Sequence, residues 1–134
     1  MNAEANTTVS HFQAGTDTVT DARTSLTWSH TLGEGNFKKA EKLIAEANKM
    51  KLGGFDDWRL PTVEELFCLA DRSRHSPAID TNFFPDTKSD WYWTSSSSAF
   101  DSGGAWVVGF SGGGSSGFGR SGSAFVRAVR SARQ

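Results

Sequence analysis

Polar and apolar residues alternate in the first 28 positions of the chain, most clearly at 7–12, 19–21 and 26–28. Between these runs, residues 15–17 and 21–24 are built from Gly, Asp, Thr, Ala and Arg, a composition that favours turns. Alternation with a period of two places every second side chain on one face of a strand. The first third of the chain is therefore predicted to form short antiparallel strands.

A helix is predicted next, because apolar residues recur at three- and four-residue steps between Phe37 and Ala47. Lysine and glutamate occupy the other faces, a pattern typical of a solvated helix surface. Asn36 is placed to cap the first turn, and two glycines at 53–54 end the element soon after Met50.

A second helix is predicted to begin after Thr62, because Glu65 follows three residues later and completes a capping box. Apolar residues at 66–70 follow as its buried stripe. Cys68 lies within this run and is expected to be a small buried hydrophobe. A nucleophilic role for its thiol would need an electropositive partner, and no nearby residue in the sequence supplies one.

The last third changes character, since residues 91–130 contain no Lys, Glu, Gln, Met or Asn and are rich in Ser and Gly. Composition alone would suggest a flexible linker, but residues 105–110 alternate and residues 125–130 have the pattern of a closing strand. The alternation predicts Trp106, Val108 and Phe110 on the core face of one strand. The residues expected to point outward are Val107, Gly109 and Ser111. The predicted fold class is α+β, with two helices packed on short antiparallel sheets.

Length and charge exclude several classes of protein. The 134 residues suit one domain over 1–134, and the formal net charge of −1 argues against a protein that grips nucleic acid through a basic face. No apolar run approaches the roughly 18 residues that a membrane span needs. The single cysteine excludes an intramolecular disulfide and a cysteine-based zinc cluster. No signal peptide is recognisable at the N-terminus, which leaves the compartment open.

No catalytic residue, metal ligand or cofactor site is expected from the motifs. Residues 112–117 match G-x-G-x-x-G by letter, but no helix is predicted after them to receive a phosphate. His11, His30 and His75 fit no catalytic pattern and are interpreted as solvated or hydrogen-bonding side chains. The acidic pairs at 56–57 and 64–65 are explained by a turn and by the first turn of a helix.

Six segments taken together resemble the Lcl C-terminal domain family. They lie in the family's order at 19–28, 54–66, 78–85, 92–96, 105–110 and 126–130, and they cover nearly the whole chain. The resemblance implies a C-type lectin-like fold related to the formylglycine-generating enzyme. That enzyme needs a cysteine pair, and the calcium-binding triplets of animal lectins are also missing here. Neither that catalysis nor calcium-dependent sugar binding is therefore carried over.

Residues 95–130 also resemble the variable region of proteins diversified by retroelements, in which a reverse transcriptase miscopies template adenines. The residue alphabet matches, and so does the spacing of Phe110, Gly113 and Arg120. The resemblance implies an invariant frame of Trp106, Val108, Phe110, Val126, Arg127, Val129 and Arg130. The implied ligand-binding positions are Ser97, Ser98, Phe100, Asp101, Val107, Gly109, Ser111, Gly114, Ser115, Ser116, Gly117, Phe118, Gly119, Ser121, Gly122 and Ser123.

These observations predict a non-enzymatic binding protein that displays a variable face to a protein or cell-surface target. Extracellular or cell-surface display is the expected location. The candidate energetic anchors are Phe100, Val107, Phe118 and Arg120. The alternative is a fixed-sequence adhesin or glycan binder, for which a net charge of −1 gives little support if the glycan is a sulfated glycosaminoglycan. The ligand and the oligomeric state stay open.

Overall fold

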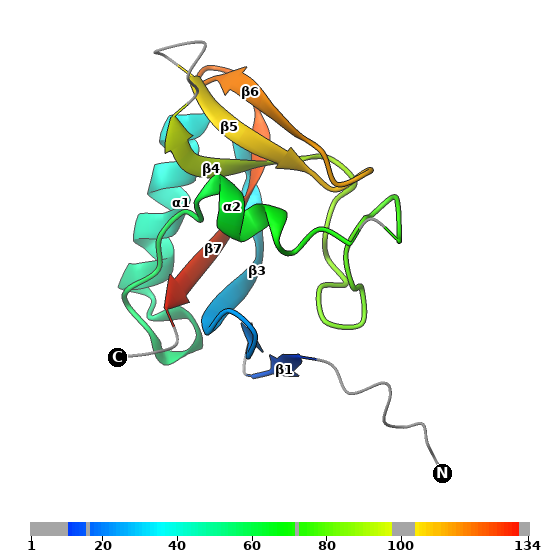
Figure 1. Ribbon diagram of the computed structural model, residues 1–134. Helices are drawn as coiled ribbons and strands as arrows, with labels where there is room; N and C mark the ends of the chain where they lie inside the picture. Colours follow the sequence, from blue (N-terminus) through cyan, green and yellow to red (C-terminus); the bar gives the residue numbers. More distant parts are fainter. Residues whose placement is uncertain (1–10, 16, 72, 98–103, 132–134) are drawn as a thin grey trace.

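The computed structural model describes residues 11–15, 17–71, 73–97 and 104–131. Within these ranges one sheet of seven strands is flanked by helices (Figure 1). The elements in chain order are β1 (Phe12–Ala14), β2 (Thr18–Asp21), β3 (Leu26–Gly35), α1 (Phe37–Lys49), the 3-10 turn η2 (Leu52–Gly54), α2 (Val63–Phe67), β4 (Trp91–Ser97), β5 (Gly104–Gly109), β6 (Ser115–Gly119) and β7 (Ala124–Ser131). The α+β class predicted from the sequence is confirmed, but the predicted short antiparallel sheets are one mixed sheet of seven strands.

The strand order across the sheet is β1-β2-β3-β7-β4-β5-β6. Neighbouring strands are antiparallel except β4 and β7, which pair in parallel at Tyr92 and Phe125. Figure 1 shows β4, β5 and β6 crossing above β3 and β7, so the sheet has two arms that meet along β7 and β4. The C-terminal strand therefore joins the N-terminal hairpin to the arm that carries the Ser- and Gly-rich segment.

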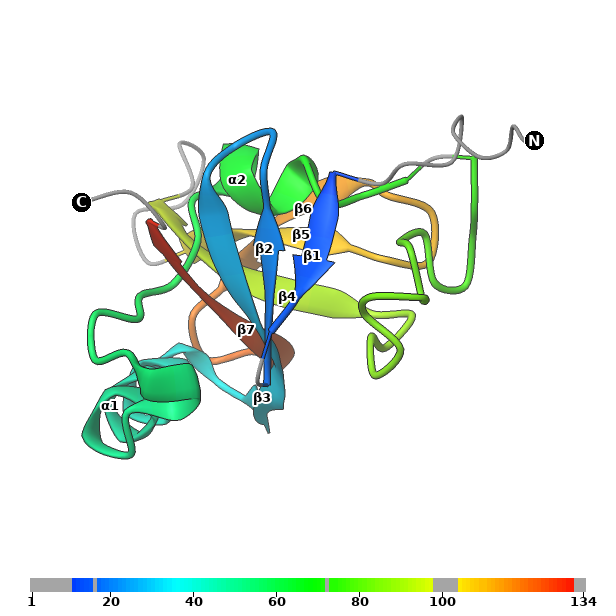
Figure 2. The same cartoon turned by 90° about the horizontal axis from the view of Figure 1, so that it is seen from below.

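The predicted strands at 19–21 and 26–28 form, whereas most of the predicted strand at 7–12 lies outside the described residues and β1 occupies Phe12–Ala14. Strand β3 extends well past the predicted end at residue 28 because it follows β7 as far as Gly35. Its register shifts between Trp28 and Thr31 and again between Thr31 and Gly33. Irregularities of this kind bend a strand and increase its twist. Figure 2 views the molecule from below, with β1, β2 and β3 in front of β4.

Both helix starts are confirmed in detail. The side chain of Asn36 accepts a hydrogen bond from the Lys39 N–H, which caps α1 at the predicted residue. Thr62 and Glu65 form the complete capping box of α2, each side chain bonding the other residue's backbone N–H. The second helix spans only five residues and ends at Phe67, after which the Leu69 and Ala70 N–H groups bond carbonyls three residues back in a tighter turn. No helix in the described ranges is long and apolar enough to span a bilayer.

Two apolar clusters cover the two faces of the sheet. One contains Leu66 of α2 together with Tyr92, Val108 and Phe110. The other contains apolar residues of α1 with Trp93 and Val107. Strand β5 is therefore buried on both faces, which alternation in its sequence does not reveal. The sequence predicts that one face of β5 points outward, but both faces are buried along most of the strand.

Candidate functional site

Strand β6 and the turns on either side of it carry most of the predicted binding positions, and β6 is an edge of the sheet. We define the display surface as the predicted positions that the structure leaves exposed or half-buried on and around this edge. The exposed members are Ser97, Ser111, Gly114, Ser115, Gly117, Gly119, Ser121 and Ser123. The half-buried members are Ser116, Phe118 and Gly122.

Two predicted binding positions are wrong. Val107 has no exposed surface and belongs to the cluster on the α1 side of the sheet. Gly109 is buried, and a Cβ atom placed on it would lie 2.8 Å from the Trp91 ring. The expectation that this side of β5 faces outward fails because the rings of Trp91, Trp93 and Phe118, from the neighbouring strands, pack over it in the cluster that also contains residues of α1. On the opposite face Val108 and Phe110 are buried as predicted, whereas Trp106 is only half-buried.

Three other predicted positions, Ser98, Phe100 and Asp101, lie outside the described residues. They belong to the segment between β4 and β5.

Phe118 connects the display surface to the core. Its ring centroid lies 5.7 Å from that of Trp91 and 6.1 Å from that of Trp93, the latter in an edge-to-face arrangement. Such aromatic pairs add stability beyond the area they bury. Phe118 is therefore partly a structural residue, although the sequence predicts it as a binding anchor.

Arg120 fastens the turn after β6 to the start of α1. Its guanidinium carbon lies 4.8 Å from the centroid of the Phe37 ring, and its backbone carbonyl accepts a 3.0 Å hydrogen bond from the Phe37 N–H. The guanidinium also donates to the Ser97 hydroxyl at 3.3 Å. The end of β4 and the turn after β6 are thereby held side by side.

The glycine-rich segment before β6 is a hairpin turn. The Gly109 N–H donates to the Gly114 carbonyl at 2.8 Å, and Gly113 adopts a left-handed φ of 84°. The Phe110 carbonyl accepts a 2.6 Å bond from the Ala78 N–H, which ties the turn to a distant loop. A strand follows instead of a helix, so the G-x-G-x-x-G match has no phosphate-binding context, as the sequence predicts.

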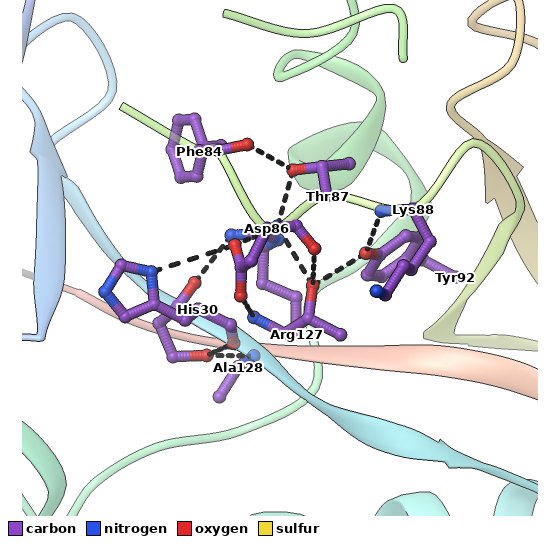
Figure 3. A network of polar contacts seen from close by, with 10 residues as sticks. His30, Phe84, Asp86, Thr87, Lys88, Tyr92, Arg127 and Ala128 are labelled. Atoms are coloured by element: carbon purple, nitrogen blue, oxygen red, sulfur yellow. Dashed lines mark hydrogen bonds and ion pairs between the residues drawn. The ribbon is translucent and has the colours of Figure 1, made fainter. Parts of the chain in front are cut away.

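Arg127, one residue of the predicted frame, is fully buried at the junction of the two arms (Figure 3). Its guanidinium donates to the Ser29 carbonyl and to the Thr87 hydroxyl, each at 2.8 Å, and lies 3.6 Å from the Asp86 carboxylate. The Phe84 ring stacks beneath it at 4.8 Å. Burial lowers the pKa of Arg127, an effect opposed by the nearby Tyr92 and Asp86. This network fixes the loop at 84–88 against β3.

Two ion pairs involve carboxylates from the acidic pairs at 56–57 and 64–65, and in one of them the arginine is buried. Arg59 forms two parallel 2.8 Å hydrogen bonds with Glu65, which lower the pKa of Glu65. Arg130 pairs in the same two-pronged way with Asp57 and lowers the pKa of that carboxyl. Strand β7 places Arg130 beside Asp57, which is 73 positions earlier in the sequence. No sequence motif predicts this contact.

The predicted burial of Cys68 is wrong, because its residue is exposed. Cys68 still has helical φ and ψ at the end of α2, and it lies two positions, about 200° round the helix axis, from the buried Leu66, so its side chain faces away from the core. Cys68 and His11 both line a cavity of about 340 Å³. Arg23 supplies the nearby positive charge missing from the sequence argument, donating to the Cys68 carbonyl at 3.3 Å. No hydrogen bond in the described part of the chain reaches the thiol itself.

The three histidines have different surroundings. His11 bonds the buried Asp21 carboxylate at 2.7 Å, and His30 lies 3.8 Å from Asp86. His75 is exposed. Among the residues placed by the structure, no group of three or more His, Cys, Asp or Glu side chains is positioned to hold a metal ion.

A sequence model of the Lcl C-terminal domain matches residues 17–130. The chain belongs to the Lcl C-terminal domain family. A comparison with curated protein sequences found no match. The family match begins just before β2 and ends in β7, so it includes every strand of the sheet except β1, the Arg127 network and the described part of the display surface.

Proposed function

We propose that this member of the Lcl C-terminal domain family is a non-enzymatic binding domain whose display surface contacts a protein or cell-surface target. The observation that carries the proposal is the contrast between β6 and its surroundings. The outer positions of β6 and most residues of its flanking turns are small and exposed, while the strand beside it is buried on both faces. Variable or adaptable contacts on a rigid frame are typical of binding sites.

The frame residues support this proposal by their positions. Arg127 is buried in the network of Figure 3, and Val126 and Val129 are buried in the two clusters. Substitution at the exposed Ser and Gly positions of β6 would leave these contacts intact. A surface of this kind can change its ligand without changing its fold.

The finer parts of the proposal come from the resemblances. We assign the scaffold to the C-type lectin-like folds, place it at an extracellular or cell surface, and infer that a retroelement diversifies the display surface. The gene neighbourhood tests diversification directly. A near-copy of the codons for residues 95–130, differing at adenines and lying beside a reverse transcriptase gene, is the expected finding. Its absence would leave a protein of fixed sequence.

Binding is tested with the whole chain on arrays of cell-surface proteins and glycans. Ser121→Arg places a large charge on the display surface, and Ala45→Arg makes the same change of charge on the exposed face of α1. A true ligand is expected to lose affinity for the first variant and to keep it for the second. Equal binding by both variants would refute the assigned surface. Binding of heparin alone, weakened by salt, would favour the glycan alternative.

A further inference from the structure

The outer edge of β6 has backbone hydrogen-bonding groups that no strand pairs. The Gly109 N–H bonds the Gly114 carbonyl, and Val108 stands opposite Ser115. In antiparallel pairs the hydrogen-bonded residues alternate, so the N–H and C=O groups of Ser116 and Phe118 point toward β5. Those of Ser115, Gly117 and Gly119 point away from the sheet. We call these three residues the open edge.

The open edge lacks the usual protection of edge strands. Natural edges are blocked by charged side chains, prolines or bulges, and β6 consists of Ser, Ser, Gly, Phe and Gly. The Gly119 carbonyl accepts a hydrogen bond from the Gly122 N–H. Within the described ranges, the backbone groups of Ser115 and Gly117 that point outward have no partner. An incoming strand could pair with both residues.

A small pocket lies beside this edge, on the face of the sheet that α2 covers. It has a volume of about 160 Å³ and is lined by Val63, Glu64, Phe67 and Ser115. A residue paired with Ser115 would direct its side chain to the same face, over Val63 and Phe67. The space suits one aliphatic side chain.

The Glu64 carboxylate at the pocket favours a positively charged side chain on the incoming strand, at the position that pairs with Gly117. Glu64 is exposed, and its carboxylate has no ion pair or hydrogen bond in the described part of the chain. Gly117 is cross-strand partner to the half-buried Trp106 and offers no side chain of its own. A basic side chain paired with Gly117 would lie on this face beside the indole ring, with a carboxylate nearby. Both features favour a cation.

We propose that β6 binds an extended peptide segment of a partner protein by antiparallel strand addition. The segment carries an aliphatic residue opposite Ser115 and, two positions earlier in its chain, a lysine or arginine opposite Gly117. Backbone pairing supplies affinity and the pocket supplies selectivity, as in other strand-addition complexes. This inference rests on the proposed binding function and specifies the partner of the same surface.

The first experiment uses a fluorescein-labelled heptapeptide, acetylated and amidated, with lysine third, valine fifth and threonine elsewhere. Binding to the full chain is measured by fluorescence anisotropy. Gly117→Pro removes an outward N–H at an edge position where proline is tolerated, and Gly117→Ala keeps that N–H. We expect affinity to fall about five- to tenfold with the proline variant and less than about threefold with the alanine variant.

The peptide provides a matched backbone control. N-methylation of the valine removes a donor that faces β6, whereas N-methylation of the preceding threonine removes one that faces away. Loss is expected for the first peptide alone. The charge contact is tested with Glu64→Lys, which should weaken the lysine peptide and strengthen a peptide with glutamate at the third position.

Three results would overturn strand addition. The first is that the peptide does not bind at millimolar concentration, and the second is that the two Gly117 variants bind it equally well. The third is that this chain forms a dimer through the same edge and that Gly117→Pro abolishes the dimer. A ligand from the arrays that loses affinity with Ser121→Arg but not with Gly117→Pro would preserve the proposed function and reject this mode. Failure of every ligand would reject both.

Discussion

Arg59 and Glu65 face each other with two parallel hydrogen bonds of 2.8 Å, and Glu65 also accepts the Thr62 N–H that begins α2. One carboxylate therefore joins the helix cap to the segment before it. Arg59 in turn pairs with Val129 of β7 through backbone bonds in both directions. The short second helix is thus anchored to the sheet by charge as well as by its apolar residues.

Acid should weaken this link in a defined direction. The pKa of Glu65 is lowered, chiefly by the hydrogen bonds from Arg59, so its contribution to stability is present above the unfolded pKa of about 4.3. The contribution is lost as the pH falls through the lower folded pKa. Glu65→Gln, which keeps the cap, is expected to reduce the free energy of unfolding by about 0.5–1 kcal/mol at pH 7.

Urea unfolding at pH 7 and pH 3 measures this effect. The difference between wild type and Glu65→Gln should shrink at pH 3, where the wild-type carboxyl is losing its charge. Glu64→Gln is the matched control, because the neighbouring carboxylate is exposed and makes no ion pair in the described ranges. A pH-independent difference for Glu65→Gln would show that the ion pair contributes nothing.

Arg127 should be among the most sensitive positions in the chain. Arg127→Met leaves the Ser29 carbonyl and the Thr87 hydroxyl without their donor and the Asp86 carboxylate without its cation. Loss of one partner from a buried charged network costs about 3–5 kcal/mol, a large part of the stability of a domain this size. Arg127→Lys keeps the charge but loses the planar fork and should cost less.

Tryptophan fluorescence during urea unfolding measures the stability loss of Arg127→Met and that of Arg127→Lys. If Arg127→Met fails to fold, the shift in the unfolding midpoint of Arg127→Lys still measures the network. Unchanged stability in the lysine variant would indicate that the planar fork makes no contribution.

Local features of this fold are predictable from sequence because their causes are local. Asn36 and the Thr62–Glu65 pair cap their helices by contacts within three residues. The length of β3 is set by pairing with β7, nearly a hundred positions away, and its sequence contains no stop or start signal for that pairing. The Arg127 network depends on the same long-range register.

The candidate site is predictable only in part, for a related reason. Ser115, Gly117 and Gly119 of β6 are exposed and Ser116 is half-buried, and the resemblance names all four positions. The burial of Val107 depends on which elements cover each face of β5, and one strand's alternation cannot specify two covering layers. The open edge and its pocket require the strand order, which places β6 last, and the position of α2.

Phe118 should contribute to both stability and binding. Phe118→Ala removes the ring that packs against Trp91 and Trp93, and for a half-buried ring we expect a loss of about 1–3 kcal/mol. Phe118→Leu preserves most of the apolar volume and should cost less. Thermal unfolding of the two variants measures the loss of stability before any binding is tested. A ligand that loses affinity for a folded Phe118→Ala protein, and less for Phe118→Leu, would identify the ring as a binding anchor.

Cys68 should react readily and be dispensable for folding. Its residue is exposed, so a disulfide reagent such as 5,5′-dithiobis-nitrobenzoate should label the native protein at nearly the rate of the urea-unfolded chain. Cys68→Ser is expected to change stability by less than about 0.5 kcal/mol. If the reagent labelled Cys68 only after unfolding, the thiol would be buried, as the sequence predicts.

Glycine is required at position 109 and is replaceable at position 112. A Cβ atom at Gly109 would lie 2.8 and 2.9 Å from two ring atoms of Trp91, a side chain that packs against the Phe118 ring, whereas a Cβ at Gly112 meets nothing within 4 Å. Neither residue has a left-handed φ, so packing alone separates them. Overpacking a site of this kind costs about 1–3 kcal/mol. Gly109→Ala should lower the unfolding midpoint accordingly, and Gly112→Ala should leave it unchanged or slightly raised. If both alanine variants were equally stable, packing would not require glycine at position 109. That position could then vary and contact a ligand, as the sequence predicts.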